Sequence, residues 1–219
     1  MISTKAFLFS SLMHHFEYYK RSDETLRIAK NKYSWMISDT LSDESIEVRY
    51  HLLEYLSQEF WFSGILTQDA HGWPIPISLI QSHEWASHIS RFLSLQEPQK
   101  QRKLYWSLSH SENYLAFIIS DTPTGIDIAE YEERDDALLA LHKEEEYALL
   151  GGRNWHNFYL LWTAKEAIIK SIWWILDDMK NISVRERTWN LDHFFEFHGS
   201  LYTINHIQDS DVFLSYTSS

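Results

Sequence analysis

Cysteine is absent from this chain of 219 residues. Disulfide bridges and thiolate metal sites are therefore excluded as sources of stability or of chemistry. Positive charge is scarce as well, because 19 Lys and Arg residues stand against 31 Asp and Glu residues and give a formal net charge of −12. A balance this acidic argues against a nucleic acid as the partner of the protein.

Long hydrophobic runs are also missing. A membrane-spanning helix needs about 20 consecutive apolar residues, and Lys170 interrupts even the run from Ala167 to Leu176. The segment Ala6–Met13 is similar to the core of a signal peptide, but it continues into His14 without a small-residue cleavage site, so we expect a buried first strand. The sequence thus predicts a cytoplasmic protein without a membrane partner.

What the chain does contain is typical of a folded protein. Hydrophobic residues make up 44% and aromatic residues 16%, which argues against disorder. The length suffices for one large or two small domains. Apolar periodicity predicts helices at 42–61, 135–150 and 155–175, and strands at 65–67, 105–109, 114–120, 125–129, 194–197, 201–204 and 212–216. One long helix against a few antiparallel strands, occurring twice, predicts the α+β class.

Two acids stand out in this pattern. Asp127 lies among apolar neighbours in a short predicted strand, and the helix that follows carries Trp162, Glu166 and Lys170 in one row at four-residue spacing. A strand acid and a helix acid can converge on one Mg²⁺, which prefers oxygen ligands and the phosphates of a substrate. A lysine beside them would suit such a phosphate.

Other interpretations of these residues stay open. Glu166 and Lys170 are also an ordinary i,i+4 pair, which on a solvated face stabilises a helix by about 0.2–0.5 kcal/mol. Asp127 alone is compatible with an edge or turn position. An unrelated Mg²⁺-dependent enzyme acting on phosphates, or a purely structural α+β protein, would show the same isolated features.

Three motifs in order add a family resemblance. Ser107-Leu108-Ser109-His110-Ser111, Gly125-Ile126-Asp127-Ile128 and Trp162-Thr163-Ala164-Lys165-Glu166-Ala167 with Lys170 resemble the signature motifs of the 4′-phosphopantetheinyl transferases. The resemblance is strong over residues 100–175. The length is similar to that of the surfactin-type branch, in which one chain forms a pseudodimer of two halves. The resemblance to this branch implies two subdomains, 1–111 and 112–219, each with a long helix against a small antiparallel sheet. It also implies that the protein is a monomer.

The resemblance also implies a reaction and its site. Coenzyme A would be the substrate, and a serine of an acyl, polyketide or peptidyl carrier protein would attack its β-phosphate and release 3′,5′-ADP. Asp127 and Glu166 would hold Mg²⁺. The residues expected to bind coenzyme A are Ser109, His110, Lys165 and Lys170. The residues expected to act in catalysis are Glu166, Lys170 and Glu146, and the general base stays open between Glu166, through a metal-bound water, and Glu146.

The chain departs from the family pattern at two places. Surfactin-type members usually carry a second acid two residues after Asp127, where this sequence has Ala129 and places Glu130 one residue further. The family also has a Gly-Lys-Pro turn, and this sequence has Trp73 at the position of its lysine. A degenerate relative that only binds coenzyme A or a carrier protein is therefore the alternative function. Basic residues that could meet phosphates are Lys100, Arg102 and Lys103 and, as weaker candidates, Lys30, Lys32 and Arg49.

Overall fold

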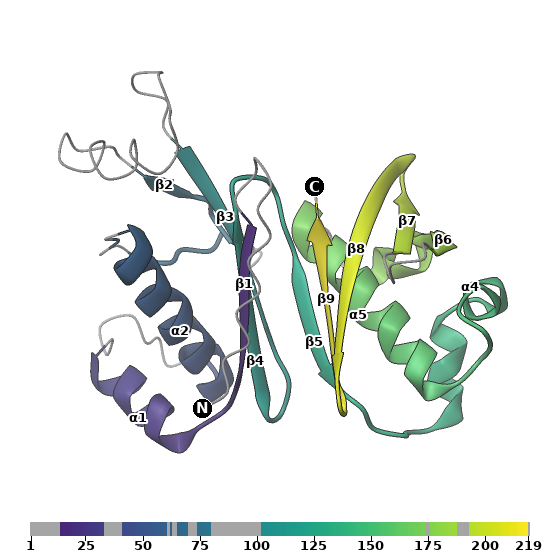
Figure 1. Ribbon diagram of the computed structural model, residues 1–219, viewed down its shortest axis with the longest axis horizontal. Helices are drawn as coiled ribbons and strands as arrows, with labels where there is room; N and C mark the ends of the chain where they lie inside the picture. Colours follow the sequence, from purple (N-terminus) through teal and green to yellow (C-terminus); the bar gives the residue numbers. More distant parts are fainter. Residues whose placement is uncertain are drawn as a thin grey trace.

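The computed structural model describes residues 14–32, 41–60, 62, 65–69, 74–79, 102–173, 176–187 and 193–218. It shows two antiparallel sheets, each with a long helix packed on one face, so the α+β class is confirmed (Figure 1). The strand predicted at Ala6–Met13, the turn residue Trp73 and the basic candidate Lys100 lie outside the described residues. Within them, no helix is both long and apolar enough to cross a membrane.

The first sheet belongs to the N-terminal half of the chain. Its strands have the order β1-β4-β3-β2, and their bounds are β1 His14–Lys20, β2 Ile77–Leu79, β3 Arg102–His110 and β4 Tyr114–Ser120. Two helices, α1 (Asp23–Lys32) and α2 (Asp43–Phe60), accompany this sheet on one side (Figure 1). Helix α2 packs Val48, Leu52 and Leu56 into the core between helix and sheet.

Strand β4 is buried on both faces, which explains its continuous apolar sequence. Leu115, Phe117 and Ile119 alternate toward the core under α2. Ala116 and Ile118 point the other way and pack against the second sheet. The middle of the molecule is therefore a contact between two sheets, because neighbouring residues of a strand point to opposite faces.

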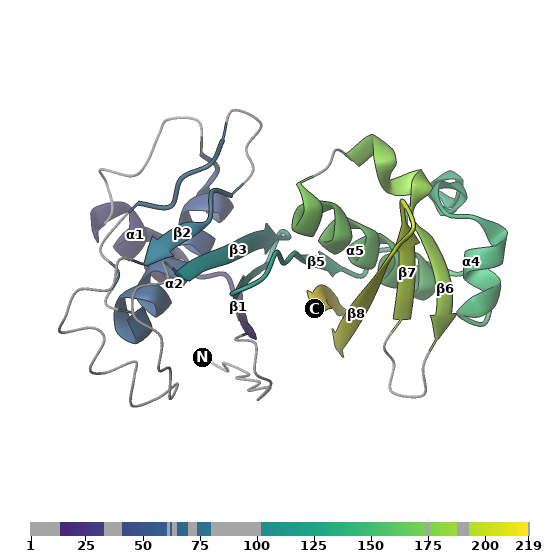
Figure 2. The ribbon, with the colours of Figure 1, turned by 90° about the horizontal axis from the view of Figure 1, so that it is seen from above.

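The second sheet has the order β5-β9-β8-β7-β6. The bounds of its strands are β5 Ile126–Glu130, β6 Ser183–Arg187, β7 His193–Phe197, β8 Ser200–Asp209 and β9 Val212–Ser218. Helix α5 (Trp155–Ile172) lies along one face of this sheet, and the short elements η2 (Asp136–Leu141), α4 (Glu144–Leu149) and η3 (Leu176–Asn181) lie beside it (Figure 2).

The two halves repeat one topology. In each half, the last strand of the chain segment lies between the first strand and the strand that precedes it in sequence. The order is β1-β4-β3 in one half and β5-β9-β8 in the other. The expected boundary after Ser111 falls in the hairpin between β3 and β4, which share a sheet. The chain passes from one sheet to the other between Ser120 and Ile126.

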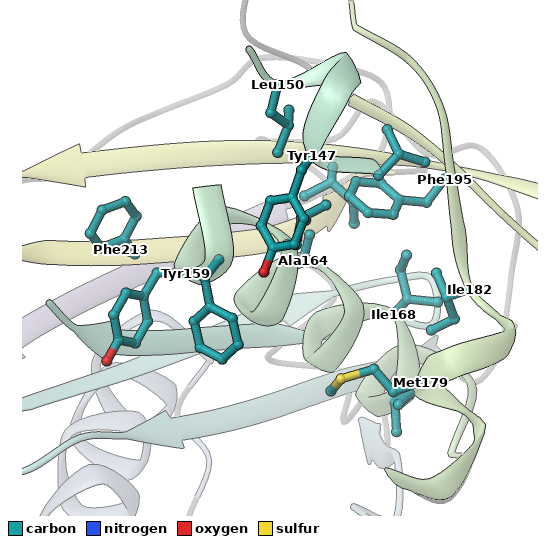
Figure 3. Close-up of a cluster of buried hydrophobic side chains, with 14 of the residues drawn as sticks. Tyr147, Leu150, Tyr159, Ala164, Ile168, Met179, Ile182, Phe195 and Phe213 are labelled. Atoms are coloured by element: carbon teal, nitrogen blue, oxygen red, sulfur yellow. The ribbon is translucent and has the colours of Figure 1, made fainter. Parts of the chain in front are cut away.

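The core of the second half lies between α5 and its sheet (Figure 3). Ala164 and Ile168 of α5 face Phe195 and Phe213 of the strands. The helix begins at the cap Asn154, whose side chain accepts a hydrogen bond from the amide of residue 157, and ends three residues earlier than predicted. At its end Trp173 takes a left-handed conformation with φ 57°, and its amide donates to a carbonyl of the last turn.

The single helix predicted at 135–150 is wrong, because the structure divides it into η2 and α4. His142 and Lys143 between them are extended, with ψ angles of 155° and 149°. The His142 ring is buried against Tyr147 and Phe158, with centroid distances of 6.0 and 5.1 Å. A new helix then starts at Lys143, whose amide donates to Glu146 Oε2 at 3.0 Å. Burial of one polar ring and a local cap thus outweigh helical periodicity.

Candidate active site

Asp127 lies in β5, at the contact between the two halves. Its neighbours Ile126 and Ile128 pack into the core between the sheets, so Asp127 points to the opposite face, toward α5. Its exposed fraction is 6%. The strand can come this close to the helix because residue 125 is glycine: a Cβ there would lie 1.9 Å from the carbonyl oxygen of Ala167.

Lys170 joins the three sequence motifs. Its Nζ donates to Asp127 Oδ1 at 2.7 Å, to Ser109 Oγ at 3.1 Å and to the carbonyl oxygen of Ile126 at 3.2 Å. Ser109 Oγ in turn donates to Asp127 Oδ1 at 2.7 Å and accepts from the amide of Ile128 at 3.2 Å. Residues from β3, β5 and α5 therefore form one hydrogen-bonded cluster, as the three motifs together predict.

Glu166 lies one turn before Lys170 and is half-buried. Among the described residues, it has no hydrogen bond and no ion pair, and Lys170 pairs with Asp127 instead of with Glu166. The surface i,i+4 pair that remained open from the sequence is therefore wrong. The pKa of Glu166 is raised from 4.5 to about 7, first by burial and then by the negative charge of Asp127, while Lys170 opposes the shift.

The acids fit a hard divalent cation. Every hydrogen bond that Asp127 accepts from the described residues ends on Oδ1, which leaves Oδ2 without one. Glu166 offers both carboxylate oxygens, and a cation near it would offset the repulsion that raises its pKa. Within the same part of the chain, no group of three His, Asp or Glu residues is arranged to hold a metal. Mg²⁺ suits such a site, because it binds through one or two carboxylates and completes its shell with water and phosphate oxygens.

The position of the missing family acid is now visible. Ala129 is two residues beyond Asp127 on the same face of β5 and packs against the core under α5. Glu130 points away and accepts hydrogen bonds of 2.8 Å from both the amide and the side chain of Asn113. Glu130 therefore does not replace the acid that Ala129 lacks.

Lys165 is not brought to this cluster. It precedes Lys170 by five residues on α5, which at 100° per residue turns it about 140° away. Its Nζ donates to Glu146 Oε2 at 2.8 Å, and the exposed fractions of the two side chains are 1% and 3%. Burial lowers the pKa of Lys165, against the effect of Glu146. Lys165, expected to bind coenzyme A, and Glu146, expected to act in catalysis, instead pair with each other between α5 and α4.

His110 ends β3 and points to the opposite face from Ser109, because the two are adjacent in a strand. The residue is exposed, and partial desolvation of its ring lowers its pKa. The charges that act on it come from Glu44, Lys170, Arg21 and Asp127, so it lies at the junction of the halves.

Ser107 is a site residue that the sequence reasoning missed. Its Oγ accepts a hydrogen bond of 3.3 Å from the amide of Ile126, as Ser109 Oγ does from the amide of Ile128. The two serines occur at period two on one face of β3, and that spacing was the available signal. Together they hold β5 beside β3 and so fix the position of Asp127.

The part of the chain that carries Asp127, Glu166 and Lys170 is similar to a known superfamily. A model of the 4′-phosphopantetheinyl transferase superfamily matches residues 123–211, which include Asp127, Glu166 and Lys170. No curated protein matches the chain. The matched segment begins after Ser109 and His110, so the superfamily match alone does not cover the β3 side of the site. It supports a transferase of this kind, and it does not distinguish the branches of the superfamily.

Proposed function

We propose that this protein transfers 4′-phosphopantetheine from coenzyme A to a serine of an acyl, polyketide or peptidyl carrier protein in a Mg²⁺-dependent reaction. The observation that carries the proposal is the cluster of Ser109, Asp127 and Lys170, which joins three motifs within hydrogen-bond distance beside Glu166. The pseudodimeric, surfactin-type branch fits the repeated topology of the two sheets. Both sides of the site come from one chain, which supports action as a monomer.

The chemistry asks the protein for positioning and charge compensation. The serine oxygen forms a bond to the β-phosphorus, the bond from that phosphorus to the bridging oxygen breaks, and 3′,5′-ADP leaves. Asp127 Oδ2 and the Glu166 carboxylate would hold Mg²⁺, which would supply electrostatic stabilisation of the phosphate oxygens. Lys170 keeps its ammonium group at the same place, where it would offset negative charge that develops during transfer.

Glu166 is the better of the two candidates for general base. Its carboxylate interacts with the charges of Asp127 and Lys170, and a bound Mg²⁺ would keep it ionised. Glu146 is 3% exposed and already accepts hydrogen bonds from Lys165 and from the amide of Lys143. We therefore assign a structural role to Glu146, which holds Lys165 in place, so Glu166 remains the candidate beside the transfer site.

A protein that binds coenzyme A without transferring from it is the second candidate. The observation in its favour is Ala129, which leaves the metal with two protein carboxylates while Glu130 is occupied by Asn113. The two functions differ in their products, because a binding protein leaves every carrier protein unmodified.

Intact-mass measurement of apo carrier proteins after incubation with the protein, coenzyme A and Mg²⁺ tests the proposal. We expect one carrier type to gain a single phosphopantetheine and the gain to disappear when the metal is chelated. Lys170→Met should lower the rate about 10²–10³-fold, as removal of a group that stabilises transition-state charge does. Lys180→Met is the matched control, since Lys180 is an exposed lysine of η3. Binding of coenzyme A with no mass gain on any carrier would support the second candidate.

A further inference from the structure

A row of polar side chains crosses the second sheet beneath α5. Asp127 of β5 pairs in register with Ser215 of β9, which pairs in register with His206 of β8. Side chains at directly opposed positions of antiparallel strands lie on one face, with Cβ atoms about 4.5–5.5 Å apart. This face is the one that α5 covers, because Ser215 Oγ lies 2.7 Å from Thr163 Oγ1 of the helix. Asp127 therefore has a polar neighbour that the proposed reaction does not use.

The hydrogen bonds of this row run in one direction. Thr163 Oγ1 donates to the carbonyl oxygen of Tyr159 at 2.8 Å, which uses the only proton of this hydroxyl. The bond between the two hydroxyls must then be donated by Ser215. Since Ser215 has no second proton, His206 Nδ1 is the donor across the 2.8 Å that separate it from Ser215 Oγ. A hydrogen-bond chain thus leads from His206 through Ser215 and Thr163 to the backbone of α5, and we call it the hydroxyl chain.

The two hydroxyls are buried in an apolar interface. The exposed fractions of Thr163 and Ser215 are both 0%. Around them the core between α5 and the sheet contains Ala164, Ile168 and Phe213 (Figure 3). Apolar contacts are non-directional, whereas a hydrogen bond between two oxygens fixes their separation and angle. The hydroxyl chain therefore contributes a defined geometry that apolar side chains of the same shape would not.

The hydroxyl chain is one of two polar anchors of α5. Thr163 binds Ser215, and seven residues later Lys170 binds Asp127 at 2.7 Å. Seven residues span about 10 Å along a helix and bring both anchors to within about 20° of one line on its surface. Glu166 lies between them on the same side of the helix, three residues after the first anchor and four before the second. The position of Glu166 over the sheet thus depends on both anchors.

We propose that the hydroxyl chain is a positioning device that sets the distance between Asp127 and Glu166. This inference rests on the proposed function, in which these two carboxylates hold Mg²⁺. The ion demands near-octahedral geometry with ligands at about 2.0–2.1 Å, so a small shift of the helix weakens its binding. An alanine occupies the place of the third family acid, which leaves the placement of the two remaining acids to the fold. Thr163 and Ser215 are positioning residues, because they act through the helix and the strand that carry the acids.

Calorimetric titration with Mn²⁺ in the absence of coenzyme A tests this role. Thr163→Val keeps the shape of the side chain and removes the hydroxyl, so it should weaken Mn²⁺ binding about tenfold, as loss of a group that orients metal ligands does. Thr163→Ser keeps the hydroxyl and should retain the affinity of the wild type. Ser120→Ala is the matched control, because it removes a fully buried hydroxyl whose partner is Thr122 and not a residue of α5. The control should bind Mn²⁺ as the wild type does.

A double variant separates positioning from stability. Thr163→Val alone leaves the buried hydroxyl of Ser215 without its acceptor, whereas Thr163→Val with Ser215→Ala removes both hydroxyls and leaves the half-buried His206 ring to donate to water. Denaturant unfolding should therefore find the double variant more stable than Thr163→Val. Its Mn²⁺ affinity should stay as low as that of the single variant. If the affinity instead returned to the wild-type value together with the stability, the hydroxyl pair would have a structural role only and the proposal would be overturned.

Nitrogen NMR of the imidazole checks the direction of the hydroxyl chain. Nδ1 of His206 should carry a proton in the neutral ring of the wild type, and an unprotonated Nδ1 would overturn the proposal.

The positioning role and the proposed function fail in different ways. Wild-type Mn²⁺ affinity in Thr163→Val would remove the positioning role alone. A wild type that binds no Mn²⁺ would remove the metal assignment of the proposed function, and the positioning role with it. A failure to modify any carrier protein would leave all of these measurements unaffected.

Discussion

Metal binding by the free protein should depend on pH through Glu166. The pKa of this carboxyl is raised to about 7 by burial and by Asp127, and a cation bound at the two acids requires the ionised form. Protonated Glu166 therefore competes with the metal. Metal binding and proton release are coupled in the way that is general for acidic ligands.

The size of the effect follows from the pKa. With a pKa of about 7, roughly one tenth of Glu166 is ionised at pH 6 and roughly nine tenths at pH 8. The affinity for Mn²⁺ should fall about tenfold for each pH unit below 7 and become constant above about pH 8. Lys170→Met should move this transition to higher pH, since Lys170 is the group that lowers the pKa of Glu166.

The Glu166 carboxyl also affects the stability of the metal-free protein. Its contribution changes with pH in the opposite direction to that of an ordinary paired acid. Because its folded-state pKa is above its unfolded value of 4.5, its contribution is fully present below pH 4.5 and is lost as the pH rises through about 7. Full conversion of this shift corresponds to about 3 kcal/mol. Partial exposure of Glu166 reduces the expected loss to roughly 1–2 kcal/mol.

Calorimetric titration with Mn²⁺ at several pH values checks the affinity, and denaturant unfolding checks the stability. Glu166→Gln is the control, because it removes the titrating group and should abolish both dependences. Equal Mn²⁺ affinity at pH 6 and pH 8 in the wild type would refute the reasoning. In that case Glu166 would either be ionised throughout this range or lie away from the metal.

Three further substitutions test other parts of the structure. Gly125→Ala places a Cβ 1.9 Å from the carbonyl oxygen of Ala167. We therefore expect denaturant unfolding to show a loss of about 1–3 kcal/mol in stability. Wild-type stability of this variant would show that β5 and α5 are further apart. His142 has a pKa lowered to about 3 by burial and by Lys165, so its contribution is lost as the pH falls from 6.5 toward 3. His142→Phe should flatten this acid destabilisation in unfolding curves, and an unchanged pH profile would contradict it. Ala129→Glu adds a carboxylate on the face of β5 that carries Asp127, and it should tighten the binding of Mn²⁺ in the absence of coenzyme A. Unchanged affinity would show that residue 129 does not reach the metal.

Sequence patterns were most informative where local chemistry dominates. The apolar run of β4 and the periodicity of α2 predicted these elements because their burial follows directly from side-chain spacing. The prediction failed at His142, where a buried ring and a new helix cap interrupt a helical pattern. No periodicity carries that information, since it depends on contacts with Tyr147 and Phe158 from the folded chain.

For the site, the sequence alone determined which residue types are present, their order, and the four-residue spacing that puts Glu166 and Lys170 on one side of a helix. Only the tertiary structure decided the partners. It joined Lys170 to Asp127 across 43 positions of sequence, turned Lys165 toward Glu146, and left Arg49 without a carboxylate among the described residues. A charged side chain extends several ångströms from its backbone, and the nearest opposite charge is set by how the elements pack, so pairing of this kind becomes visible only in the folded protein.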